Sequence, residues 1–94
     1  MGVAQLNTFS LLNQLMEKRK DIDLLIGKTL RKARLEKNLS QEKLAEFANF
    51  ERSYVSKVEN GERAIQLITF IRFAKALDLK PSDLIKDFEN KIKI

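Results

Sequence analysis

The sequence predicts an all-α fold of six helices in one small domain. Apolar residues recur with the 3.6-residue period of a helix, and no stretch shows the alternating apolar and polar pattern of a strand. Only three glycines and one proline interrupt the 94 residues, and no glycine- or serine-rich linker divides them. A chain of this length fits a single domain with a modest core, and its apolar content of 44% is typical of a globular protein.

The first two predicted helices lie between Gln5 and Asn38. The first runs from about Gln5 to Lys20 and has an apolar face. The second starts near Asp21 or Asp23, because either carboxylate can cap the helix and is favoured at the positive end of its dipole. The apolar face of the first helix comprises Leu6, Phe9, Leu12, Leu15 and Met16. The inward face of the second comprises Ile26, Leu30 and Ala33.

Two short helices follow, joined by a tight turn. Ser40 is predicted to cap the first of them, which covers Gln41 to about Ala48, because its hydroxyl can accept from a first-turn amide. Asn49 is one of the few residue types that tolerate the left-handed conformation at a helix end. The second short helix covers about Arg52 to Asn60, and Phe50 is expected to fill the bend between the two.

Two further helices complete the predicted domain. One spans about Gln66 to Leu77, and the last begins at Pro81, a residue suited to the first helical position, and ends near Glu89. Asp83 lies in the first turn of the last helix, where acidic residues are favoured. The chain is therefore divided into an N-terminal helical extension at residues 1–22, a domain at residues 23–90 and a basic tail at residues 91–94.

The composition favours a polyanionic partner and disfavours catalysis. The formal net charge is +5 and the pI is near 9.6, which is typical of a domain that binds nucleic acid. The chain contains no cysteine and no histidine, so the usual general base, the common zinc ligands and both conventional catalytic triads are missing. We therefore expect no enzyme activity, no metal and no cofactor.

The second short helix presents a polar side without an acid. Val55 and Val58 fall on its inward face, whereas the opposite side carries Arg52, Ser53, Ser56 and Lys57. A helix fits the major groove of B-form DNA, where such donors meet guanine N7 and O6. A polar outer face is also what any helical domain presents to solvent, so geometry alone leaves both interpretations open.

Four motifs in order carry a resemblance to a known family: LRKAR, SQEKLAEFA, VSKVENGER and FAKALDL. The segment from Ile26 to Ile85 resembles the lambda-repressor-like, xenobiotic-response-element-type helix-turn-helix regulators of bacteria and phages. The segment RSYVSKVENGE is similar to the controller proteins of restriction–modification systems. The resemblance implies a five-helix DNA-binding domain, here with an additional N-terminal helix. It also implies a sequence-specific transcriptional regulator that binds double-stranded DNA at a symmetric operator as a homodimer.

The resemblance also implies which residues act. Gln41 stands where the family contacts the DNA backbone, and Asn60 and Arg63 stand where it clamps phosphate. The base-contacting positions fall on Arg52, Ser53, Ser56 and Lys57. Tyr54 either touches DNA or is a partly buried aromatic with its hydroxyl in solvent. Arg34 and Glu59 stand where the family has a partly buried ion pair. Glu51 departs from the family, because Ser, Thr or Asp would cap the following helix better at its position.

The helix from Gln66 to Leu77 is apolar nearly all round, so it must be covered on more than one side. One side belongs to the core, and either the N-terminal helix or a second subunit covers the other. The expected dimer contacts are Ile68, Ile71, Leu84, Ile85 and Phe88.

Other functions remain open at this stage. The same fold could serve as a protein-interaction module, such as an antitoxin that occupies a toxin, although no particular protein partner is indicated. The N-terminal helix could lie on a membrane, but its polar face carries Asn7, Asn13 and Gln14 and not the basic residues usual there. No stretch is long and apolar enough to span a membrane and no signal peptide is apparent, so a cytoplasmic location is expected.

Overall fold

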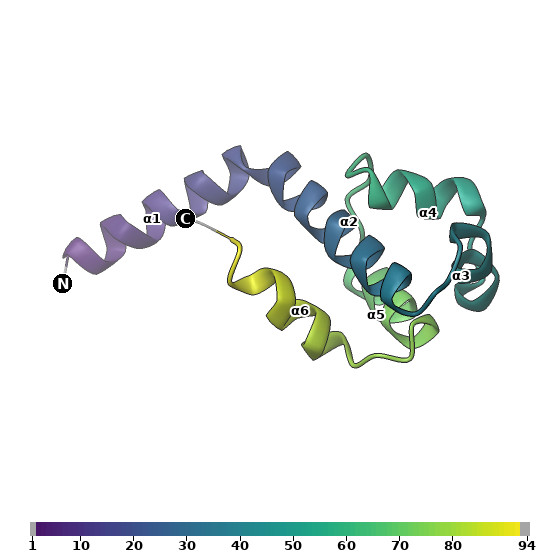
Figure 1. The fold of residues 1–94 in the computed structure, drawn as a ribbon. Helices are drawn as coiled ribbons and strands as arrows, with labels where there is room; N and C mark the ends of the chain where they lie inside the picture. The colour runs from purple at the N-terminus through teal and green to yellow at the C-terminus, as the bar shows by residue number, and fades with distance from the viewer. Residues whose placement is uncertain (1, 93–94) are drawn as a thin grey trace.

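The computed structural model describes the backbone of residues 2–92 and the side chains of residues 8–92, so the side chain of Leu6 and the last two residues of the basic tail lie outside it. The described residues form six helices and no strand, which confirms the predicted fold class (Figure 1). The helices are α1 (Gly2–Glu17), α2 (Arg19–Glu36), α3 (Gln41–Ala48), α4 (Arg52–Glu59), α5 (Leu67–Ala76) and α6 (Pro81–Glu89).

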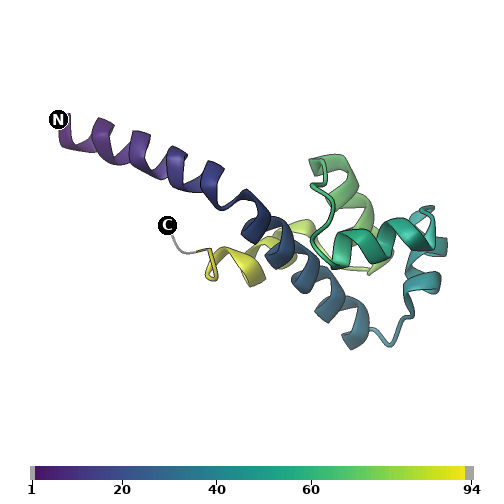
Figure 2. The same ribbon diagram turned by 90° about the horizontal axis from the view of Figure 1, so that it is seen from above.

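The junction between α1 and α2 lies at Lys18, so the predicted caps at Asp21 and Asp23 are wrong. The Lys18 amide donates to the Gln14 carbonyl over 3.0 Å, and the Ile22 amide donates to the Lys18 carbonyl over 2.9 Å. The first bond is the last of α1 and the second is the first of α2, so α2 begins at Arg19, ahead of both aspartates, and Asp21 lies in its first turn. The chain bends between the two helices, and α1 projects beyond the rest of the molecule (Figures 1 and 2).

The ends of the short helices agree with the predicted caps. The Lys43 amide donates to the Ser40 hydroxyl over 3.0 Å at the start of α3, and Asn49 adopts a left-handed conformation with φ of 59° at its end. Three other helices end in the same way, on Asn38, Gly61 and Asp78. In each case the following amide donates five residues back, as in a Schellman motif. These ends define the turns that place α3 against α4 and α5.

Helices α2 to α6 together enclose the core. Its largest fully buried side chains are Phe73, Leu30, Leu44, Leu77, Val55 and Val58. Leu84 is only 4% exposed and belongs to this core, so its predicted place in a dimer contact is wrong. It packs inward because α6 lies against both α2 and α5.

One side of α5 remains uncovered within the chain. Leu67 and Ile68 are 68% and 61% exposed, whereas Phe70, Phe73 and Ala74 are buried. The N-terminal helix was one of two predicted covers, but α1 points away from α5 (Figures 1 and 2). That alternative is therefore not realised within a single chain.

Candidate nucleic-acid interface

Helix α4 separates its apolar and polar residues as the sequence predicts. Val55 and Val58 are 0% and 1% exposed, and they anchor the helix in the core. Its outward residues fall within an arc of about 140°, since successive helical residues are about 100° apart. Those residues are Arg52, Ser53, Lys57 and Asn60, all exposed, and Ser56, which is half-buried. The structure thus brings the predicted base-contacting residues to one side of α4.

Tyr54 lies beside this arc and packs against aromatic neighbours. Its ring centroid is 5.0 Å from that of Phe50 and 6.4 Å from that of Phe73. Phe50 in turn lies 4.9 Å from Phe73, so it fills the bend between α3 and α4 as predicted. These contacts favour the interpretation of Tyr54 as a partly buried aromatic residue that fixes α4.

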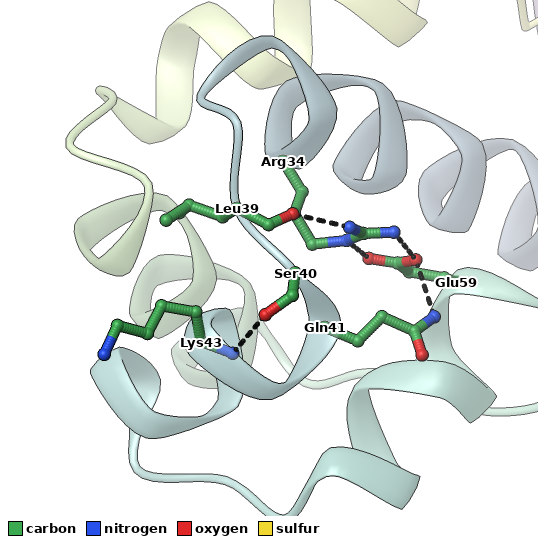
Figure 3. A network of polar contacts seen from close by, with 6 residues as sticks. All are labelled: Arg34, Leu39, Ser40, Gln41, Lys43 and Glu59. Carbon is green, nitrogen blue, oxygen red and sulfur yellow. Dashed lines mark hydrogen bonds and ion pairs between the residues drawn. The ribbon is translucent and has the colours of Figure 1, made fainter.

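The ion pair between Arg34 and Glu59 is present and buried (Figure 3). Arg34 Nε and Nη2 donate to the two carboxylate oxygens over 2.7 and 3.0 Å, and the side chains are only 7% and 1% exposed. Arg34 Nη1 also donates to the Leu39 carbonyl over 2.7 Å. One guanidinium group therefore joins the end of α2, the loop before α3 and the last residue of α4.

Gln41 is joined to the same carboxylate. Its Nε2 donates to Glu59 Oε1 over 3.0 Å (Figure 3). An amide nitrogen has two hydrogens, so one remains to donate to an incoming acceptor such as a phosphate oxygen. The sequence indicated Gln41 and Glu59 separately, and the structure shows that Glu59 holds the Gln41 side chain in place.

Arg72 on α5 contributes to this region, although we did not predict it. Its Nη2 donates to the carbonyls of Ala48 and Asn49 over 2.8 and 2.9 Å, and its guanidinium lies 4.0 Å from the centre of the Phe50 ring. A cation is favoured at the negative end of a helix, here the end of α3. A single arginine within the apolar sequence LITFIRFAKA was the available signal.

Gly27 allows α2 to approach the end of α4, which the sequence also did not reveal. A β-carbon at this position would lie 2.3 Å from the Val58 carbonyl oxygen and 2.7 Å from that of Glu59. Both obstacles are backbone atoms, so a rotamer change could not relieve the clash. The absence of a side chain at Gly27 is therefore what lets α4 lie where it does.

The exposed cations near α4 are available to a ligand. Within residues 8–92, the side chains of Arg52, Lys57 and Arg63 have neither a hydrogen bond nor an ion pair. Arg63 is exposed in the loop just beyond the end of α4, close in sequence to Asn60. Glu51, the residue before Arg52, is exposed at the start of the helix and makes no capping bond. Its carboxylate adds a negative charge beside these cations.

A family model described as helix-turn-helix matches residues 30–84, which is more than half of the chain. This chain belongs to the helix-turn-helix family of transcriptional regulators. The matched segment contains the buried ion pair and the outward side of α4. The family's members are regulators and not enzymes.

Controller proteins of restriction–modification systems are among the family members most similar to this chain. Control protein C.BamHI of Bacillus amyloliquefaciens is 42% identical over 66 residues, which cover 69% of this chain and 82% of that protein. The crystal structure of C.AhdI from Aeromonas hydrophila is 41% identical with a TM-score of 0.66, covering 68% of this chain and 97% of that one. The C.Esp1396I tetramer bound to its natural 35-base-pair operator is 25% identical with a TM-score of 0.70, covering 73% and 91%. The predicted family and fold are thereby confirmed.

Two negative findings complete the description of this helix-turn-helix protein. Among the described residues, no group of three or more metal-ligating side chains is close enough to hold a metal ion. In the same part of the chain, no helix has the length and apolar character that crossing a membrane requires.

Proposed function

We propose that this chain regulates transcription by binding a symmetric operator as a homodimer, with α4 of each subunit in the major groove. The observation that carries the proposal is the division of α4, with Val55 and Val58 buried and Arg52, Ser53 and Lys57 exposed. The named relatives support a role as a restriction–modification controller protein. The operator complex of C.Esp1396I supports DNA as the ligand. Because the DNA of a bacterium lies in the cytoplasm, we also propose that location.

The division of labour along α4 follows from side-chain chemistry. Arg52 can donate two parallel hydrogen bonds to guanine from the start of the helix, the end that reads base edges in helix-turn-helix proteins. Ser53, Ser56 and Lys57 complete the base-reading set, while Gln41, Asn60 and Arg63 are proposed to contact the backbone. Tyr54 contributes by packing. Arg34 neutralises Glu59, so the carboxylate beneath α4 does not repel phosphate.

Replacing Arg52 by alanine should weaken binding to the preferred operator by about 1–3 kcal/mol if the contact is bidentate. The loss should be confined to one base pair of each half-site, because a base contact discriminates only where it is made. Fluorescence anisotropy with the operator and with duplexes substituted at single positions measures this loss. The variant should tolerate substitutions at its own base pair and at no other.

Arg63→Ala is the matched contrast, since it also removes one exposed arginine. If Arg63 meets phosphate, this variant should weaken binding to all sequences alike, and the slope of log affinity against log salt should fall by about one. If the two variants give the same pattern, the proposed separation of base and phosphate contacts is wrong.

The proposed dimer contact is the uncovered apolar face of α5 and α6. Ile68, Ile71, Ile85 and Phe88 are exposed or half-buried there, beside a shallow apolar hollow formed with Ile26. A two-fold symmetric operator requires the two α4 helices of such a dimer to meet half-sites about 34 Å apart, one helical turn of DNA.

Ile68→Asp should convert the dimer formed by this face to monomers and weaken operator binding. The isoleucine is 61% exposed, so its replacement should leave the fold of the single chain intact. Sedimentation velocity measures the mass. Ser82→Asp on the exposed surface of α6 adds the same charge and should change neither property. A dimer that persists in Ile68→Asp would place the contact elsewhere.

A further inference from the structure

Helix α1 lies outside the fold that this chain shares with its relatives. The family match begins at residue 30, and the similarity to C.AhdI covers 97% of that protein but only 68% of this chain. Its main contact is with α2, which follows it directly. The described molecule measures 50 × 23 × 19 Å, and α1 forms one end of it, away from α3 and α4 (Figures 1 and 2).

The apolar residues of α1 are in solvent. Phe9, Leu12 and Met16 are 67%, 55% and 77% exposed. Their spacing of three and four residues is that of the seam along which two helices pack in a coiled coil. We call these three residues the α1 seam. Leu15 and Asn13 flank it, since each lies within about 60° of a seam residue around the helix, whereas Ser10 and Gln14 lie on the other side.

A helix of this kind needs a partner. Isolated helices shorter than about 12–15 residues are marginal in water even when rich in alanine, and packing of an amphipathic face supplies most helical stability in proteins. α1 has 16 residues, and no described element of the same chain covers the seam. Its helical form therefore points to a surface outside the single chain.

The charge pattern identifies the kind of surface. Residues 2–16 contain no charged side chain, although the whole chain carries a net charge of +5. DNA requires cations at the contact, and an anionic membrane surface requires basic residues along the polar face of the helix. An uncharged seam instead fits another uncharged apolar helix. A second α1 has this property, and two copies can meet without repulsion between like charges.

We propose that α1 packs antiparallel against α1 of a second copy of this chain through the α1 seam. Antiparallel packing places opposite ends of the two helix dipoles side by side. The contact is separate from the α5–α6 face, so the two contacts can form independently of each other. Where that face already makes dimers, the α1 seam joins two of them.

The test compares three full-length proteins by sedimentation equilibrium over a range of concentrations. The first is the wild type, the second carries Phe9→Glu with Leu12→Glu, and the third carries Ser10→Glu with Gln14→Glu. Both doubles add two negative charges within the same turns of α1, but only the first pair lies in the seam. At concentrations where the wild type self-associates, the seam variant should have half its mass and the control should match the wild type.

Two results would overturn the proposal. One is a seam variant whose mass equals that of the wild type at every concentration. The other is binding of the wild type, and not of the seam variant, to vesicles of phosphatidylcholine and phosphatidylglycerol without any self-association. That result would make α1 a membrane contact. Affinity for a duplex with one half-site should be equal in all three proteins. A failure of DNA binding in all of them would contradict the proposed function and not the α1 contact.

Discussion

Replacing Arg34 by alanine should lower the free energy of unfolding by about 3–5 kcal/mol, because it leaves the Glu59 carboxylate buried without its partner. The Glu59 side chain is 1% exposed, and among the described residues its carboxylate accepts bonds only from Arg34 and Gln41. Domains of this size are stable by about 5–15 kcal/mol in total, so the loss would unfold a substantial fraction of the protein. Urea denaturation followed by circular dichroism measures it.

Two further variants separate stability from DNA contact. Arg34→Lys keeps the charge but not the two parallel bonds, so its stability should fall between the wild type and alanine. Replacing both members, as Arg34→Met with Glu59→Leu, should restore much of the stability, because no charge is then buried without a partner. An Arg34→Ala protein as stable as the wild type but unable to bind DNA would mean that Arg34 contacts DNA directly.

The second large effect is expected at Gly27. An alanine β-carbon there would lie 2.3 Å from the Val58 carbonyl oxygen, so α2 and α4 would have to separate. Overpacking of this kind typically costs about 1–3 kcal/mol in stability. Because α4 carries the proposed base contacts, operator affinity should fall even under conditions where the variant is fully folded. Thermal unfolding and anisotropy on the same samples measure the two effects.

Lys28→Ala is the control for Gly27→Ala, since it alters an exposed neighbour on the same turn of α2. Its stability should stay within about 0.5 kcal/mol of the wild type, as for most surface substitutions. A Gly27→Ala protein with wild-type stability and affinity would show that the approach of the two helices is not tightly constrained.

Local signals in the sequence predicted most of the fold. Ser40 accepts a bond from the first turn of its helix, Asn49 is left-handed, and Pro81 begins the last helix, because each of these roles depends on the residue itself and its nearest neighbours. The pair of Arg34 and Glu59 was available only through the family resemblance, since 25 residues separate its members.

The errors and omissions have a common physical origin in tertiary packing. The close approach at Gly27 and the bonds from Arg72 to α3 depend on segments more than twenty residues away. Leu84 was assigned to a surface because periodicity gives the face of a helix but not the element that covers it. The start of the second helix was predicted too late because two aspartates resemble caps, whereas α2 already begins at Arg19.

The central claim is that α4, held by the core and by the pair of Arg34 and Glu59, reads base edges. Selection of bound sites from random duplex DNA, followed by affinity measurements at one fixed salt concentration, tests it most directly. We predict a two-fold symmetric site with half-sites about one helical turn apart, bound about 10³-fold or more tightly than a scrambled duplex of equal length. Recovery of no shared sequence, or equal affinity for the selected and scrambled duplexes, would contradict the claim.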